Sequence, residues 1–171
     1  MANVIDTPDL AIACIRELCL PPMFMDIWDG KLHGDLAIHW RRPRTYFRLC
    51  HDLVERVSGL EGLCPLWEEN GDTITGVLPD ERYVSFFYEN AGEDEEDEFD
   101  PNNEIRDLGH NYQQFVTSQL LSFSESGLDD TLELAARLLE YRHLSELRAL
   151  LDAYDDETGD ADLDRFRLSL K

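Results

Sequence analysis

The stretch of residues 62–90 reads GLCPLWEENGDTITGVLPDERYVSFFYEN and carries the clearest β-sheet signal in the chain. Its centre is Asn70-Gly71, a dipeptide typical of two-residue hairpins because both central positions of a type I′ turn require positive φ. After the hairpin comes a run rich in aromatic and β-branched residues, which is the composition of a strand. We therefore predict an antiparallel meander over about residues 61–89.

A two-residue turn would place Trp67 opposite Ile74, so both side chains should lie on the same side of the sheet. The third strand, residues 82–89, carries large apolar side chains on both of its faces. We therefore expect this strand either in the centre of the sheet, or covered by helices on one side and by another element on the other.

Helical periodicity fills most of the remaining chain. We interpret Leu36–Ile38 as a short strand, and the tail after Tyr154 as a final strand or an unpacked end. Together these elements predict a single α+β domain over residues 1–171, with a central, mostly antiparallel sheet and a helical C-terminal extension at about 129–171. The expected helices begin near Pro8, Met23, Arg44, Tyr112, Asp129 and Ser145.

The charge balance is extreme, with 37 acidic against 15 basic residues and a net charge of −22. Such a chain repels phosphate backbones, so we expect neither nucleic-acid binding nor attachment to anionic membranes. It favours another protein, and a basic one, as the partner. Simple colloidal solubility is the alternative explanation. Because no secretory signal and no membrane-length apolar run is visible, we expect a cytoplasmic protein.

Catalytic and metal-binding motifs are missing from the sequence. The four cysteines and five histidines show no ligand spacing typical of zinc sites. No GxSxG elbow, P-loop or GxGxxG motif occurs. We therefore expect no enzyme activity, no catalytic residues, no metal and no cofactor.

One basic cluster interrupts the acidic composition, and it begins directly after His39 and Trp40. Planar guanidinium groups suit the binding of anions or of an acidic partner group. The alternative is that these arginines pair with the acidic surface of the same chain. The candidate anion-binding residues are Arg41, Arg42, Arg44 and Arg48.

Six acids follow one another without interruption soon after the third strand. They cannot contribute to a core, and their mutual repulsion predicts a solvated loop. As a functional element, the same run is a recognition surface for a basic protein. Trp28 and Trp40 are further candidates for apolar anchors. The candidate partner-binding residues are Glu93, Asp94, Glu95, Glu96, Asp97 and Glu98, flanked by Tyr88 and Phe99.

The order of several motifs resembles the SUKH superfamily, which includes fungal cell-wall-assembly regulators and bacterial toxin-immunity proteins. The matching segments are LPPMFMDIWDG, LWEENGDTITG, YVSFFYE with the acid-rich run behind it, and NYQQFVTSQLLSF. The match covers roughly Leu20 to Phe123. The sequence departs from the family pattern in the arginine-rich helix Arg44–Val57 and in the helical tail after Asp129.

This resemblance implies an α+β fold with a central antiparallel sheet, and a function in binding and neutralising a partner protein. Two other classes stay open at this point. One is a small-ligand-binding protein or enzyme that uses the Arg41–Arg48 region. The other is a regulatory adaptor that has no toxin partner.

Overall fold

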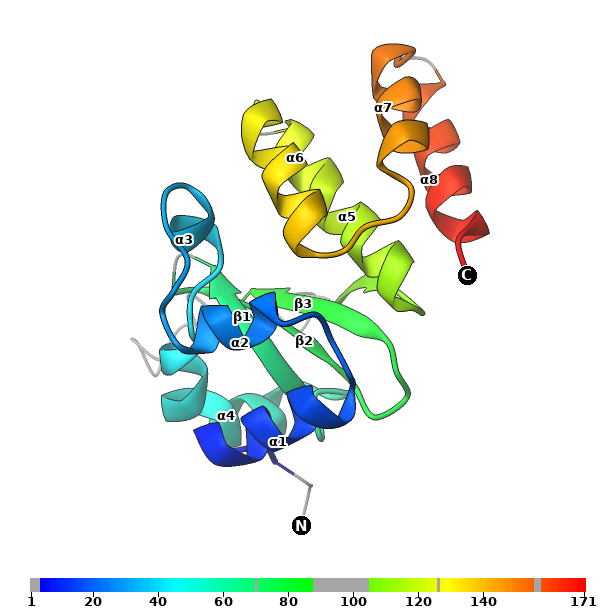
Figure 1. Cartoon of the computed structure of the whole chain (residues 1–171). Coiled ribbons are helices and arrows are strands. Elements are labelled where there is room, and N and C mark those ends of the chain that lie inside the picture. The colour runs from blue at the N-terminus through cyan, green and yellow to red at the C-terminus, as the bar shows by residue number, and fades with distance from the viewer. Residues whose placement is uncertain (1–3, 70, 88–104, 126, 156–157) are drawn as a thin grey trace. The chain divides into compact units, whose positions relative to one another are not determined.

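The computed structural model describes residues 4–69, 71–87, 105–125, 127–155 and 158–171. The chain forms two compact units, Met1–Asp107 and Leu108–Lys171. The first unit contains a sheet and helices, and the second consists mainly of helices (Figure 1). The predicted α+β class is confirmed. That residues 1–171 form a single domain stays a prediction.

The sheet has four strands in the order β1-β2-β3-β4. Both β1–β2 and β2–β3 are antiparallel pairs, which confirms the predicted meander. As expected from its two apolar faces, β3 lies between two other strands. The sequence analysis missed β4. The strands are β1 Cys64–Glu69, β2 Thr73–Val77, β3 Tyr83–Phe87 and β4 Arg106–Gly109.

The predicted register of the hairpin is wrong by one residue. Trp67 pairs with Thr75, and Ile74 pairs with Glu68. The connection has three residues, 70–72, rather than two, and Gly71 adopts a φ of +86° in it. This left-handed φ favours glycine, which has no Cβ. Glu68 and Ile74 therefore share one side of the sheet, and Trp67 lies on the other.

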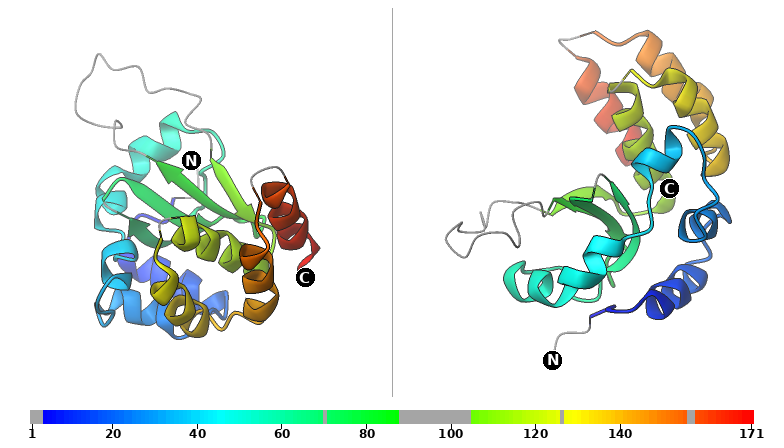
Figure 2. Two further views of the ribbon diagram at one scale, coloured as in Figure 1. Left: turned by 90° about the horizontal axis from the view of Figure 1, so that it is seen from above. Right: turned by 90° about the vertical axis from the view of Figure 1, so that its left-hand side faces the viewer.

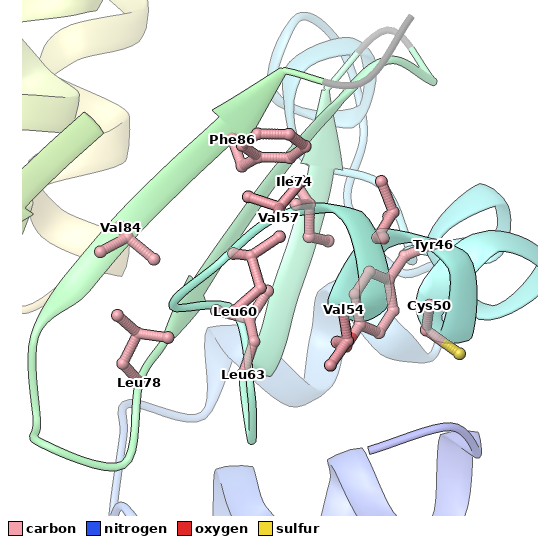
Figure 3. Close-up of a cluster of buried hydrophobic side chains, with 11 residues drawn as sticks. Tyr46, Cys50, Val54, Val57, Leu60, Leu63, Ile74, Leu78, Val84 and Phe86 are labelled. Carbon is pink, nitrogen blue, oxygen red and sulfur yellow. The ribbon is translucent and has the colours of Figure 1, made fainter. Parts of the chain in front are cut away.

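One side of the sheet is covered by α4, Arg44–Arg56. Its inward residues have the spacing of one helix face, as the sequence analysis predicts for this segment. They pack against side chains from β2 and β3 to form a buried cluster (Figure 3). The cluster includes Tyr46, Cys50, Leu53, Val54, Val57, Leu60, Leu63, Ile74, Leu78, Val84 and Phe86.

The opposite side of the sheet is organised around Trp67. Phe24 of α2, Met23–Trp28, stacks on it at 5.6 Å between ring centroids, and Trp40 approaches it at 5.2 Å. Figure 2 shows the sheet between α4 and the pair α1, Pro8–Glu17, and α2. The first unit is thus a sheet with helices on both sides.

The predicted strand at Leu36–Ile38 is wrong, because Leu36–His39 forms a short helix, α3. Only Leu36 turns inward, whereas Ile38 is 49% exposed. The amide of Trp40 donates to the carbonyl of Leu36 at 2.8 Å, which closes the helical turn. The free edge of β1, where another strand would pair, is instead bridged by Arg41.

The described residues of the second unit form four helices, and α5, α6 and α7 agree with the predicted segments. The interpretation of the tail as a strand or an unpacked end is wrong, because the tail forms α8. Acidic residues in the first turn of α8 and Arg167 in its last turn are favourable with the helix dipole. The helices are α5 Tyr112–Glu125, α6 Asp129–Leu138, α7 Leu144–Asp152 and α8 Gly159–Ser169.

Within the part of the chain that the structure describes, no helix combines the length and the apolar character that crossing a bilayer requires.

The two adjacent phenylalanines of β3 test which side of the strand is buried. Phe86 is 1% exposed and Phe87 is 41% exposed. Phe86→Ala should lower the free energy of unfolding by about 3–5 kcal/mol, because it leaves a cavity in the core. Phe87→Ala should lower it by about 1 kcal/mol or less. Chemical denaturation measures both values, and equal losses would contradict this assignment of the two faces.

Candidate functional site

The outer edge of β1 is covered by the segment that leads into α4. Arg41 and Glu68 exchange backbone hydrogen bonds, with N···O distances of 3.0 and 2.8 Å. The indole N–H of Trp28 donates to the carbonyl of Leu66 at 3.0 Å, and this contact is buried. These contacts satisfy backbone groups that an edge strand would otherwise leave unpaired. They also fix the backbone at Arg41, where the basic cluster begins.

Glu68 joins β1 to the start of α4 through its side chain. The residue is 5% exposed, and its Oε2 accepts the amides of Thr45 and Tyr46 at 2.9 and 3.2 Å. Amides in the first turn of a helix have no partner within the helix. Pro43, at the N-cap position, makes no side-chain hydrogen bond to them. The carboxylate from the sheet therefore caps the helix, and its negative charge is favourable at this end.

A pocket of about 680 Å³ opens at this junction. Its walls come from the end of α2 and the loop behind it, from α3, from the segment entering α4, and from β1 with its turn. Three of the four predicted anion-binding residues line it. The lining residues are Ile27, Trp28, Asp29, Gly30, Leu32, Ala37, Trp40, Arg41, Arg42, Arg44, Thr45, Glu68 and Gly71.

Two of the arginines are held in place by other parts of the first unit. The guanidinium carbon of Arg42 lies 5.5 Å from the ring centroid of Trp28, which is a cation–π contact. The Nε of Arg41 donates to the carbonyl of Ala37 at 3.4 Å. In both arrangements, terminal N–H groups remain that can face a ligand.

The two acidic residues of the pocket are already engaged. The carboxylate of Asp29 lies 2.6 Å from the ammonium of Lys31, and this contact raises the pKa of Lys31. Glu68 accepts the two helix amides. The pocket arginines are not neutralised in this way, because none of them forms an ion pair with any residue that the structure describes.

The alternative that these arginines pair with acids of the same chain therefore finds no support within the described ranges. Pairing with residues 93–98 lies outside them.

The other predicted residues have different positions. Arg48 is exposed one turn further along α4 and does not line the pocket. The interpretation of Trp28 and Trp40 as exposed anchors is wrong, because they are only 4% and 2% exposed. Both pack against other aromatic rings. The six acids and their flanks, Tyr88 and Phe99, lie outside the described residues.

The sequence analysis missed Glu68, which is central to this site. Glu68 lies between Trp67 and Glu69, so the sequence around it gives no sign that this one acid is buried. The predicted register also paired Trp67, rather than Glu68, with Ile74. No motif marks a carboxylate that caps a helix distant in the sequence. Only the alternation of the strand, counted in the correct register, would have placed it on the side of α4.

Other chemistry is sparse in the described ranges. No group of three or more His, Cys, Asp or Glu side chains there is arranged to hold a metal ion. All four cysteines are free thiols. Cys64 hydrogen-bonds the thiol of Cys14, which lowers the pKa of Cys14.

No family model, curated protein or solved structure matches this chain. The similarity of its motifs to the SUKH superfamily remains a resemblance between sequences.

Removing the carboxylate of Glu68 tests its role as the cap of α4. Glu68→Ala should lower the free energy of unfolding by about 1–2 kcal/mol, because two helix amides lose their acceptor. Glu68→Gln retains one acceptor oxygen and should cost less.

Glu55→Ala is the matched control, since it removes one exposed negative charge from α4 itself. It should change stability by about 0.5 kcal/mol or less. A loss for Glu68→Ala no larger than that of the control, in urea titrations, would contradict the capping role.

Proposed function

We propose that this chain is a non-catalytic, acidic protein-binding domain, and in its sharpest form an immunity protein that neutralises a basic toxin. The observation that carries the proposal is the net charge of −22, with six consecutive acids in the connection between β3 and β4. These acids bring no apolar area to the folded core. Their concentration between two strands of one sheet is accounted for by a partner of opposite charge.

The physical basis is electrostatic complementarity. An acidic surface steers a basic protein into encounter and disfavours partners of like charge. A run of carboxylates also resembles the repeated negative charge of a nucleic-acid backbone. It would therefore occlude the positively charged cleft of a nuclease. Glu93–Glu98 supply the charge in this proposal, and Tyr88 and Phe99 supply apolar anchors beside it.

The described site supports binding rather than catalysis. Arginine stays protonated at physiological pH, so the three pocket guanidinium groups cannot transfer protons as general acids or bases. The carboxylate of Glu68 is occupied by two helix amides. The resemblance to SUKH immunity proteins points in the same direction. The free thiols fit a reducing compartment, so we place the protein in the cytoplasm.

A regulatory adaptor would share the acidic surface but would have no toxin as its partner. The gene neighbourhood separates the two, because immunity proteins are usually encoded beside their toxins. Co-expression with the neighbouring gene product should rescue growth if that product is a toxin and this chain its inhibitor. Continued growth arrest on co-expression would contradict the immunity function.

The acidic run is tested by replacing its six residues with Asn and Gln. Binding to the neighbouring gene product should weaken and lose much of its salt dependence, because surface charges act through a screened field. Thermal unfolding should stay unchanged, since these side chains add nothing to the core. Calorimetric titrations at low and high salt measure both the affinity and its slope.

A control variant in which six acids elsewhere are neutralised has the same net charge as the first variant. It therefore distinguishes an effect of the acidic run from an effect of net charge alone. The control should lose less affinity than the first variant. Unchanged affinity of the first variant at low salt would contradict the acidic-surface proposal. The exposed control positions are Asp9, Glu17, Asp52, Glu55, Glu140 and Asp152.

A further inference from the structure

The pocket at the β1 edge has a charge arrangement that is unusual in so acidic a chain. With more than twice as many acids as bases, an exposed arginine would be expected to find a carboxylate of its own chain. Arg41, Arg42 and Arg44 form no ion pair within the described ranges, although Asp29 and Glu68 line the same pocket. No carboxylate in the described ranges neutralises these three positive charges.

Arg42 is oriented before any ligand arrives. Arg42 lies over the ring of Trp28, and the indole is itself fixed by its hydrogen bond to the carbonyl of Leu66. A guanidinium group is planar, and its N–H donors match a carboxylate or phosphate in a two-pronged contact. Such fixed donors lose less conformational entropy on binding than free surface arginines would.

Apolar side chains form part of the remaining walls. Ile27 is buried, and Leu32 and Ala37 are half-buried. The volume of about 680 Å³ is typical of small-molecule sites and exceeds what a bare phosphate or carboxylate fills. The chemistry of the pocket thus calls for an anionic head on an apolar body.

An extended polyanion does not fit the rest of the molecule. A net charge of −22 repels a long phosphate backbone over many contacts. A compact anion with one head group meets mainly the local field of the three guanidinium groups, because more distant acids are screened by salt.

We propose that this pocket binds a small organic anion, with its carboxylate or phosphate head on Arg42 and Arg44 and its apolar body against Leu32 and Ala37. Arg41 adds positive charge at the rim. The residues that line this site do not include the acidic run, so the probe titrations and the partner-binding experiment test the two proposals separately.

The test uses the whole chain with phenyl phosphate and phenylacetate as probes, and NMR shifts of the Trp28 indole N–H as the readout. Its resonance is assigned with Trp28→Phe. We expect saturable binding of one or both probes, since the two share the required chemistry and differ only in the head. 2-Phenylethanol lacks the charge and inorganic phosphate lacks the body, so both should bind at least about tenfold more weakly.

Matched arginine variants locate the site. Arg42→Gln and Arg44→Gln should each weaken probe binding by about tenfold or more, because each removes a charged donor. Arg48→Gln removes the same charge from the same basic cluster outside the pocket, and should change affinity by less than about twofold. All three positions are exposed, so the thermal midpoint should stay unchanged. If Arg42→Gln shifts the Trp28 indole resonance in the absence of a probe, the affinity of Arg44→Gln alone tests the location of the site.

Three results would overturn the proposal. The first is that neither aromatic anion produces a saturable shift. The second is that Arg48→Gln weakens binding as much as the pocket variants do, which would indicate only a diffuse field. The third is that inorganic phosphate binds as tightly as phenyl phosphate, which would leave an adventitious ion only.

Discussion

The capping of α4 by Glu68 is the interaction on which the arrangement of the first unit depends. The backbone of this residue pairs with Arg41, and its side chain accepts the amides of Thr45 and Tyr46. One strand residue therefore fixes both ends of the segment that carries the pocket arginines. Since a proline precedes α4, the helix has no capping side chain of its own there. The hydrogen-bond acceptor for the first-turn amides of α4 therefore comes from β1.

The same interaction determines which charged groups of the pocket are paired with each other. A buried carboxylate needs hydrogen-bond donors, and Glu68 finds them in backbone amides rather than in arginine. Asp29 is likewise held by Lys31. The guanidinium groups of Arg42 and Arg44 are therefore left without a carboxylate in the described ranges, although the chain is strongly acidic. The pocket at β1 is therefore a locally basic site in a chain whose sequence is strongly acidic.

Local signals predicted the meander, α4 and most of the second unit, because turn residues and apolar spacing act over a few positions. The predicted register of the hairpin was wrong because Asn70-Gly71 is compatible with loops of two and of three residues. α3 was missed since its four residues contain too little periodicity. In the site, arginines are visible from composition, so the cluster was found. Glu68 was not, because its role exists only when β1 and α4 meet.

Hydrogen exchange at Thr45 and Tyr46 tests the central role of Glu68 most directly. First-turn helix amides exchange readily when no acceptor covers them. The structure predicts that both amides are protected to a degree similar to the amides of the β1–β2 ladder, because opening them requires β1 and α4 to separate. Exchange of both amides at the rate of exposed backbone, with the ladder still protected, would contradict this role.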